Sequence, residues 1–232
     1  MAGYKLLRSL GHHCTKLRPT LVQLKSDWHG CASLKGVRAN CRAVILHDGV
    51  LHAESTGELQ FTEYGLSGPV IFEISRDVCQ QSGEWICVLD FLPDMDMDTL
   101  LGGLRSRGKL STEELLTGIL HNRLGRVLTA AAGIRGNRNV CDLTDEELEA
   151  VCRAVKGFAV SLTEPMGMDS AQVTAGGIVT DEFDPDTMES KLVPGLYACG
   201  EVLDIDGDCG GYNLQWAWSS GRLAGKCAGG GL

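Results

Sequence analysis

The chain has 232 residues, of which 44% are hydrophobic and 22% charged, and its formal net charge at pH 7 is −9. This composition is typical of a soluble globular protein with one large or two small cores, and no apolar run approaches the roughly 20 residues that span a bilayer. The negative charge argues against broad nucleic-acid binding, because phosphates are neutralised by clustered Lys and Arg that no segment supplies.

The first elements in chain order are a helix and a strand-rich stretch. The helix is predicted over 3–10, with Gly11 as its stop, and its abrupt start without a capping sequence leads us to expect a piece of a longer chain. Asp48-Gly49 lies between two apolar-rich runs and predicts a hairpin. Ser67 and Pro69 predict the start of a short helix. Strands are expected at 21–24, 39–47, 50–55, 58–62 and 85–91.

Residues 94–156 have a helical pattern instead. Two capping boxes, Ser111 with Glu114 and Thr144 with Glu147, predict helices that end near Gly133 and Gly157. The leucines of the first helix recur at helical spacing, which indicates a buried face. The rest of the chain is predicted as strands at 158–164, 171–182 and 191–203 and a final helix at 214–228.

The segment from Leu196 to Gly225 contains the most informative chemistry. An apolar strand over 196–199 is expected to end in Gly200-Glu201, and a helix follows Gly210-Gly211. A helix N-terminus after glycines presents unpaired N–H groups and a positive dipole end to electron-rich ligand atoms. Glu201 can accept hydrogen bonds from ribose-type or ribityl hydroxyls. From the residues alone, the alternative is a strand, a surface loop and a core helix without a ligand.

The same segment, GLYACGEVLDIDGDCGGYNLQWAWSSG at 195–221, resembles the C-terminal motif of the BaiN-type, or aminoacetone-oxidase-like, NAD(P)- and FAD-dependent oxidoreductases. Two further stretches are similar to this family, FTEYGLSGPVIFEIS at 61–75 and AQVTAGGIVTDEFDPDTMESKLVPGLY at 171–197. The stretch at 3–24 is similar to the family's passage out of its FAD domain. The resemblance therefore covers nearly the whole chain.

The resemblance implies an FAD site at three places in the chain. Glu201 would accept a hydroxyl hydrogen bond beside the ribityl and diphosphate region, and the last helix would begin at the pyrimidine side of the isoalloxazine, where it stabilises negative charge. A loop at 175–177 would lie close to the ring. The residues assigned to FAD in this way are Ala175, Gly176, Gly177, Gly200, Glu201, Gly210, Gly211, Tyr212, Asn213 and Leu214.

The family's first segment carries a GxGxxG motif that holds the ADP half of FAD, and these 232 residues contain no GxGxxG. We therefore expect the complete protein to use FAD and NAD(P)H on a small organic substrate. This chain alone is expected to be inactive and to bind FAD weakly or not at all, with the missing segment as its natural partner. The alternative is a non-catalytic binding or assembly module that uses the insert domain. No catalytic residue is identified.

The expected fold class is α+β. It comprises an exit segment of the FAD domain at 1–24, a barrel-like, strand-rich insert domain at 25–92 and 157–175, a helical subdomain at 94–156, and the C-terminal remnant of a Rossmann-like FAD domain at 176–232. Trp216 and Trp218 lie two positions apart, so they cannot share one helix face. One indole is expected in the core, and the other is expected to expose apolar surface that favours self-association.

The remaining candidates are weaker. The ten cysteines are scattered without CxxC spacing or a secretory signal, which favours reduced thiols in a cytosolic protein. The six histidines lack the spacing of a metal site, and Asp204, Asp206 and Asp208 lack the twelfth-position acid of an EF-hand, so no metal is expected. Cys209 would lie near the flavin, with simple packing favoured over a redox role.

Overall fold

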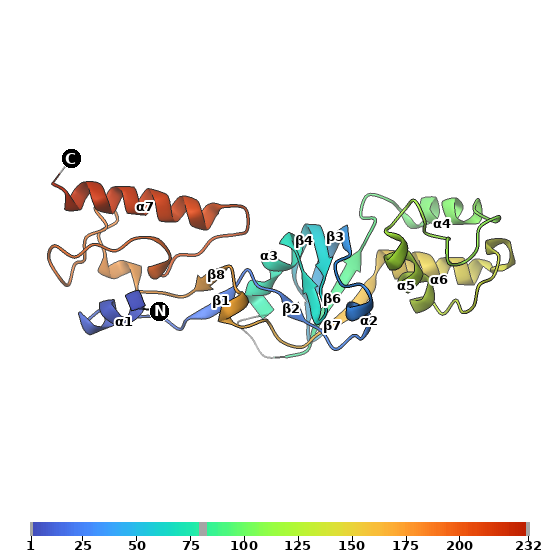
Figure 1. Cartoon of the computed structure of the whole chain (residues 1–232), viewed down its shortest axis with the longest axis horizontal. Coiled ribbons are helices and arrows are strands. Elements are labelled where there is room, and N and C mark those ends of the chain that lie inside the picture. Colours follow the sequence, from blue (N-terminus) through green and yellow to red (C-terminus); the bar gives the residue numbers. More distant parts are fainter. Residues whose placement is uncertain (1, 79–82, 231–232) are drawn as a thin grey trace. The chain divides into compact units, whose positions relative to one another are not determined.

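The computed structural model describes residues 2–78 and 83–230. The chain divides into two compact units (Figure 1). Unit 1 comprises Met1–Val22 and Met166–Leu232, and unit 2 comprises Gln23–Pro165. Residues 79–82 of the predicted insert domain, and residues 1, 231 and 232, lie outside the described part. The finer division into four domain segments stays a prediction.

Unit 2 is built on a six-stranded antiparallel sheet with the order β2-β5-β4-β3-β6-β7. The two edges of this sheet approach each other, because the Lys25 N–H donates to the Glu164 carbonyl at 2.8 Å and the Thr163 N–H donates to the Lys25 carbonyl at 2.9 Å. The sheet is therefore nearly closed. Its strands are β2 Leu24–Lys25, β3 Arg38–His47, β4 Val50–Phe61, β5 Gly65–Ser67, β6 Trp85–Asp90 and β7 Phe158–Leu162.

Helices complete unit 2 and cover part of the sheet (Figure 1). The helix α3 packs against β4, and α6 contacts both α4 and α5. Phe61, Ile71 and Leu89 are fully buried in the core that these elements share. The helices are α2 Gly30–Ser33, α3 Pro69–Val78, α4 Met97–Arg105, α5 Asn122–Ala131 and α6 Asp145–Lys156, with a 3-10 turn at Val140–Asp142.

Unit 1 has a smaller core and little sheet. The strands β1 Arg18–Thr20 and β8 Val173–Ala175 pair antiparallel, with Thr20 opposite Val173. The helix α1 spans Ala2–Ser9 and the long helix α7 spans Tyr212–Ala228. Short 3-10 helices lie at Met168–Ser170, Thr180–Glu182 and Gly200–Val202.

Two local predictions are confirmed. Asp48 and Gly49 have φ values of 48° and 79°, the left-handed conformation at both central residues that a two-residue hairpin requires, and they join β3 to β4. The capping box at the start of α6 is complete, because Thr144 accepts from the Glu147 N–H while the Glu147 side chain accepts from the Thr144 N–H.

The predicted helix between Ser111 and Gly133 is wrong over its first half. Glu114 does accept hydrogen bonds from the Ser111 hydroxyl and N–H, but these bonds close a turn and α5 begins only at Asn122. Gly118 has a φ of +80°, which ends any right-handed helix at that point. The helix α4 lies within the predicted helical subdomain at 94–156, although no bounds were predicted for it.

Several other boundaries differ from the predictions. The strand expected at 196–199 is absent, and a 3-10 helix follows at Gly200–Val202. Strands at 50–55 and 58–62 form one continuous strand, β4, and the strand at 171–182 shortens to β8. The strand at 21–24 is displaced, because Leu21 has a φ of 48° and separates β1 from β2. Ser67 lies in β5, so Pro69 opens α3 without a Ser67 cap.

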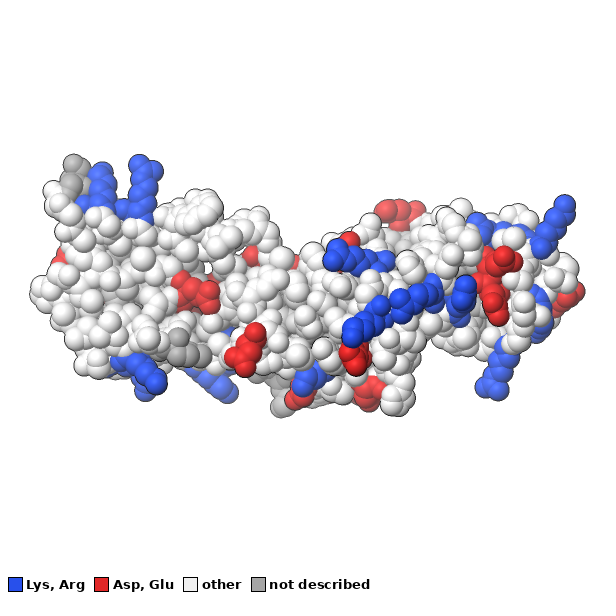
Figure 2. All heavy atoms as spheres, in the orientation of Figure 1, with Lys and Arg blue, Asp and Glu red and all other residues white. Residues whose placement is uncertain are grey.

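No helix in the described ranges is both long and apolar enough to cross a membrane. Lys, Arg, Asp and Glu side chains are interspersed over unit 2 on the face drawn in Figure 2. Several of them form ion pairs, including Arg138 with Glu147 at 2.8 Å and Lys156 with Asp90 at 2.7 Å.

Candidate functional site

The N-terminus of α7 is led by two glycines in the left-handed region. Gly210 has a φ of 119°, and Gly211, which immediately precedes the helix, has a φ of 97°. No side chain caps this helix, so the N–H groups of its first turn lack the usual capping acceptor. A Cβ added at Gly211 would meet no atom within 4 Å, which leaves the approach to the helix end open.

The side chain of Asn213 holds the loop before this helix in place. Its Oδ1 accepts from the Gly207 N–H at 2.8 Å, and its Nδ2 donates to the Gly207 carbonyl at 2.9 Å. The amide is therefore committed to the loop, and only the backbone N–H of Asn213 would be offered to a ligand. Asn213 is a positioning residue for the glycine pair.

A hollow of about 300 Å³ lies beside this helix end, entirely within unit 1. Such a volume is at the lower end of the range for small-molecule sites. Five of the ten predicted site residues line it, namely Glu201, Gly210, Gly211, Asn213 and Leu214. The structure therefore brings Glu201 and four residues of the stretch at 210–214 to one cavity, while their contact with FAD stays a prediction.

Glu201 lines both this hollow and a second one of about 430 Å³. Its Oε1 accepts from the Thr174 N–H at 2.8 Å, and its backbone carbonyl accepts from the Tyr4 hydroxyl at 3.1 Å. Burial and the Glu201 charge raise the pKa of the Tyr4 hydroxyl above its ordinary value. One carboxylate oxygen is thus used inside the protein, and Oε2 is the atom that could receive a ligand hydroxyl.

The glycines at 176, 177 and 200 do not line the hollow beside α7. A Cβ at Gly176 would approach the Lys16 carbonyl oxygen to 2.4 Å, and one at Gly177 would approach the Leu203 carbonyl carbon to 2.5 Å. Gly200 has a φ of 73°, receives the Trp216 indole N–H on its carbonyl at 3.1 Å and donates to Ser220 Oγ at 3.0 Å. Gly176 and Gly177 therefore permit close backbone packing, whereas Gly200 permits a positive φ, since a Cβ there would lie 3.6 Å from the Ala217 Cβ.

Two other predicted residues also lie outside the hollow. Ala175 is paired with Arg18 in the ladder of β1 and β8, and the side chain of Tyr212 is 65% exposed. Their predicted roles toward FAD have no geometric support from this cavity.

Sequence reasoning missed part of the lining. Leu21 and Gln172 reach the hollow because the ladder of β1 and β8 continues through a hydrogen bond from the Gln172 N–H to the Leu21 carbonyl at 3.2 Å. No local motif marks this pairing, since the two residues are far apart in the sequence. Cys209, a weak candidate from the sequence, is also part of the lining. The other added residues are Val173, Asp208 and Ala217.

Within residues 2–78 and 83–230, no group of three or more His, Cys, Asp or Glu side chains has the arrangement of a metal site. Asp204, Asp206 and Asp208 lie in the loop between the 3-10 helix at Gly200–Val202 and α7.

Comparison with known proteins places the chain in a family. Residues 1–227 match the family described as HI0933-like protein Rossmann domain. The chain is 40% identical over 234 residues to the 3-dehydro-bile acid Δ(4,6)-reductase of Clostridium scindens, a match that covers 98% of this chain and 57% of that protein.

Two further relatives have a different name. The ribosomal RNA dihydrouridine synthase of Escherichia coli is 34% identical over 222 residues, or 94% of this chain and 54% of that protein. The protein of the same name from Haemophilus influenzae is 32% identical over 164 residues, or 70% and 40%. The chain spans about half the length of the curated relatives it matches. It belongs to the HI0933-like Rossmann-domain family, which confirms the predicted relationship to the BaiN-type flavoproteins.

Proposed function

We propose that the chain forms the flavin-facing part of an FAD-dependent oxidoreductase that reduces a carbon–carbon double bond conjugated to a carbonyl group. The observation that carries this proposal is the uncapped, glycine-led N-terminus of α7, which borders a hollow of about 300 Å³. Family membership supports the flavin, and the names of the relatives support the reaction class.

The residues at the hollow suit the electron-rich edge of a flavin. The first-turn N–H groups of α7 point along the helix axis with the positive end of its dipole, and they would stabilise negative charge on a reduced ring. Leu21, Val173 and Ala217 provide an apolar lining that would exclude water. Glu201, through Oε2, would orient a hydroxyl-bearing part of the cofactor. When bound, FAD supplies the capacity to accept and donate a hydride.

The names of the relatives share one chemical theme. A Δ(4,6)-reductase of a 3-dehydro-bile acid adds hydrogen to ring double bonds conjugated to a ketone, and a dihydrouridine synthase adds hydrogen to the 5,6 double bond of uracil, which is conjugated to a carbonyl. Each reduction adds one hydride and one proton across the double bond, while NAD(P)H is oxidised to NAD(P)⁺. We propose this class of acceptor for the present chain. The two candidates within the class are a steroid-like ring and uridine.

The ADP half of FAD needs residues beyond those described above, because the 232 residues contain no GxGxxG motif. We propose that a separate segment holds that half, and the chain spans only 57% and 54% of the two relatives, which leaves room for such a segment in proteins of their length. The chain alone would then retain little flavin, because only one end of the cofactor is contacted.

The test compares the 232-residue chain with the protein encoded by the complete open reading frame around it. We expect the complete protein to purify with stoichiometric FAD, to be reduced anaerobically by NADH or NADPH, and to add two hydrogens per double bond to a 4,6-dien-3-one steroid or to uridine in RNA, as measured by mass spectrometry. The chain alone should lack flavin absorbance. A flavin-free complete protein would overturn the cofactor assignment, and a flavoprotein inert toward both acceptors would overturn the reaction class.

A further inference from the structure

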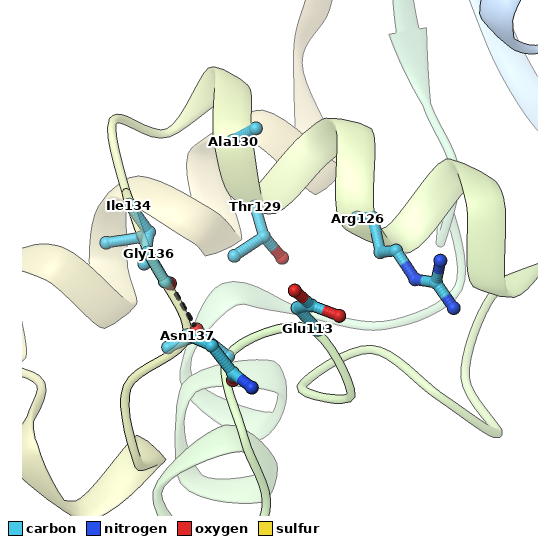
Figure 3. Close-up of a pocket in the computed structure, with 8 residues that line it drawn as sticks. Glu113, Arg126, Thr129, Ala130, Ile134, Gly136 and Asn137 are labelled. Carbon is cyan, nitrogen blue, oxygen red and sulfur yellow. Dashed lines mark hydrogen bonds between the residues drawn. The ribbon is translucent and has the colours of Figure 1, made fainter.

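Another hollow lies in the helical part of unit 2, and it shares no lining residue with the site in unit 1. It has a volume of about 310 Å³ and is bordered by α5, by the turn that contains Glu113 and by the loop that follows α5 (Figure 3). Ala130 and Ile134 give it an apolar wall. Nothing in the proposed flavin chemistry uses this hollow.

Thr129 of α5 is the feature that distinguishes it. The residue is 5% exposed, and its Oγ1 has no hydrogen-bond partner in the part of the chain that the structure describes. A helical hydroxyl usually donates to a carbonyl one turn earlier, as Ser220 does to the Trp216 carbonyl at 2.6 Å. Thr129 does not, and Figure 3 shows its hydroxyl directed toward the Glu113 carboxylate.

Thr112, which also borders the hollow, shows how a satisfied hydroxyl behaves here. Its Oγ1 donates to the Gly136 carbonyl at 3.0 Å and accepts from the Arg138 N–H at 3.2 Å, so it closes the loop onto the turn. Buried hydroxyls are hydrogen-bonded in nearly all proteins, and an exception calls for an explanation. A ligand group between Thr129 and Glu113 would be such an explanation.

The mouth of the hollow carries two opposite charges. Glu113 and Arg126 both line it, and among the described residues neither forms an ion pair or a side-chain hydrogen bond. The Glu113 carboxylate points toward Thr129, whereas the Arg126 guanidinium lies nearer the N-terminal end of α5 (Figure 3). Two unpaired charges on one rim suit a ligand that carries both signs.

We propose that this hollow binds a small zwitterion, an ammonium group joined to a carboxylate by a short carbon chain. The Glu113 carboxylate can only accept hydrogen bonds, and the Thr129 hydroxyl can accept as well as donate, so a group with two or more donors can bridge the two side chains. An ammonium has three donors. Arg126 offers only donors, which suits the carboxylate, and Ala130 and Ile134 would contact the carbon chain.

The experiment uses five probes of graded geometry with the 232-residue chain. Glycine, β-alanine and γ-aminobutyrate separate the two charges by increasing lengths, while n-butylamine and butyrate each carry one charge. Titrations followed by amide chemical shifts should give saturable binding of at least one zwitterion, with shifts centred on α5, and binding of each single-charge probe weaker by about tenfold.

Four variants decide which atoms carry the binding. Thr129→Val keeps the shape and should weaken the bound zwitterion by about fivefold, and Thr129→Ser should retain binding. Glu113→Gln and Arg126→Gln should each weaken it by about tenfold. Glu146→Gln and Arg135→Gln remove exposed charges that do not line the hollow and serve as matched controls.

Two results would overturn the proposal. One is the absence of saturable binding for all three zwitterions, which would mean that the Thr129 hydroxyl is hydrogen-bonded to water and not to a ligand. The other is binding that Thr129→Val and Glu113→Gln leave unchanged. Neither result bears on flavin binding, which is measured separately.

Discussion

His12 and Ser190 lie 178 positions apart in the sequence and are joined by a hydrogen bond of 2.9 Å between Nε2 and Oγ. His12 Nδ1 lies 2.7 Å from a Glu182 carboxylate oxygen, so the three residues have the connectivity of a Ser-His-acid triad. Ser190 Oγ, however, also accepts the N–H groups of Leu192 and Val193, and both His12 and Ser190 are buried. A nucleophile needs a free lone pair that faces its substrate, so this cluster is structural.

Ser190→Ala should therefore reduce stability without affecting any hydrolytic activity. The substitution would remove the acceptor of the Leu192 and Val193 N–H groups and the hydrogen-bond partner of His12 Nε2. We therefore expect a loss of about 1–3 kcal/mol in the free energy of unfolding. Urea denaturation measures this loss. Ser170→Ala, at an exposed position in unit 1, should change it by less than about 0.5 kcal/mol. Equal stability of the two variants, or ester hydrolysis that depends on Ser190, would contradict the structural role.

Glu182 makes the same cluster sensitive to acid. Burial acts to raise the pKa of Glu182, but hydrogen bonds from His13 and His12 outweigh it and hold this pKa below the ordinary value of 4.5. A carboxyl with a depressed pKa in the folded state contributes stability above its unfolded pKa and loses that contribution as the pH falls through its folded pKa. The chain should therefore lose stability progressively below about pH 4.5.

This acid sensitivity can be assigned with two variants. Thermal unfolding midpoints measured from pH 6 down to pH 3 should fall less steeply in Glu182→Gln than in the unmodified chain, since the substituted amide does not titrate. Glu146→Gln removes an exposed carboxylate and should leave the slope unchanged. If the midpoint falls with pH equally steeply in all three proteins, Glu182 does not contribute to the loss of stability in acid.

Gly177 is predicted to tolerate no side chain. A Cβ there would lie 2.5 Å from the Leu203 carbonyl carbon and 2.6 Å from the Asp204 nitrogen, so backbone would have to move. Gly177→Ala should cost about 1–3 kcal/mol in the free energy of unfolding. Gly167 has a φ of −73° and open space around its Cα, so Gly167→Ala should be stabilising by about 0.4–1 kcal/mol. Urea denaturation of the two variants checks that Gly177→Ala lowers the free energy of unfolding and that Gly167→Ala raises it.

Trp218 is predicted to promote self-association of the chain in isolation. Its side chain is 70% exposed and Leu214, four residues earlier on the same face of α7, is 62% exposed. Trp216 instead is half-buried and donates to the Gly200 carbonyl, so the two indoles differ in burial, as their spacing predicted.

Sedimentation equilibrium tests the role of Trp218. Trp218→Arg should shift the chain toward the monomer, whereas Leu192→Arg, at another exposed apolar position outside α7, should not. The complete protein should associate less than the chain alone if a further segment covers this face. A monomeric unmodified chain would contradict the prediction.

Local signals predicted those elements whose determining contacts are close in the sequence. The Asp48-Gly49 hairpin depends on two adjacent residues that adopt positive φ, and the Thr144–Glu147 capping box satisfies backbone groups within one turn. Ser111 and Glu114 are also hydrogen-bonded to each other, yet no helix follows directly, because Gly118 turns the chain with a φ of +80°. A capping box therefore predicts a turn more securely than it predicts the helix after it.

For the candidate site, the sequence by itself determined the glycine pair before α7, the helix that follows it and the family relationship, because a glycine-led helix start and a long motif are local properties. Only the tertiary structure decided that Leu21 and Gln172 join that helix end around one hollow, and that Glu201 bonds the backbone of Thr174. The physical reason is that the antiparallel ladder of β1 and β8 is held by hydrogen bonds between segments about 150 residues apart, and nothing in either segment alone specifies its partner.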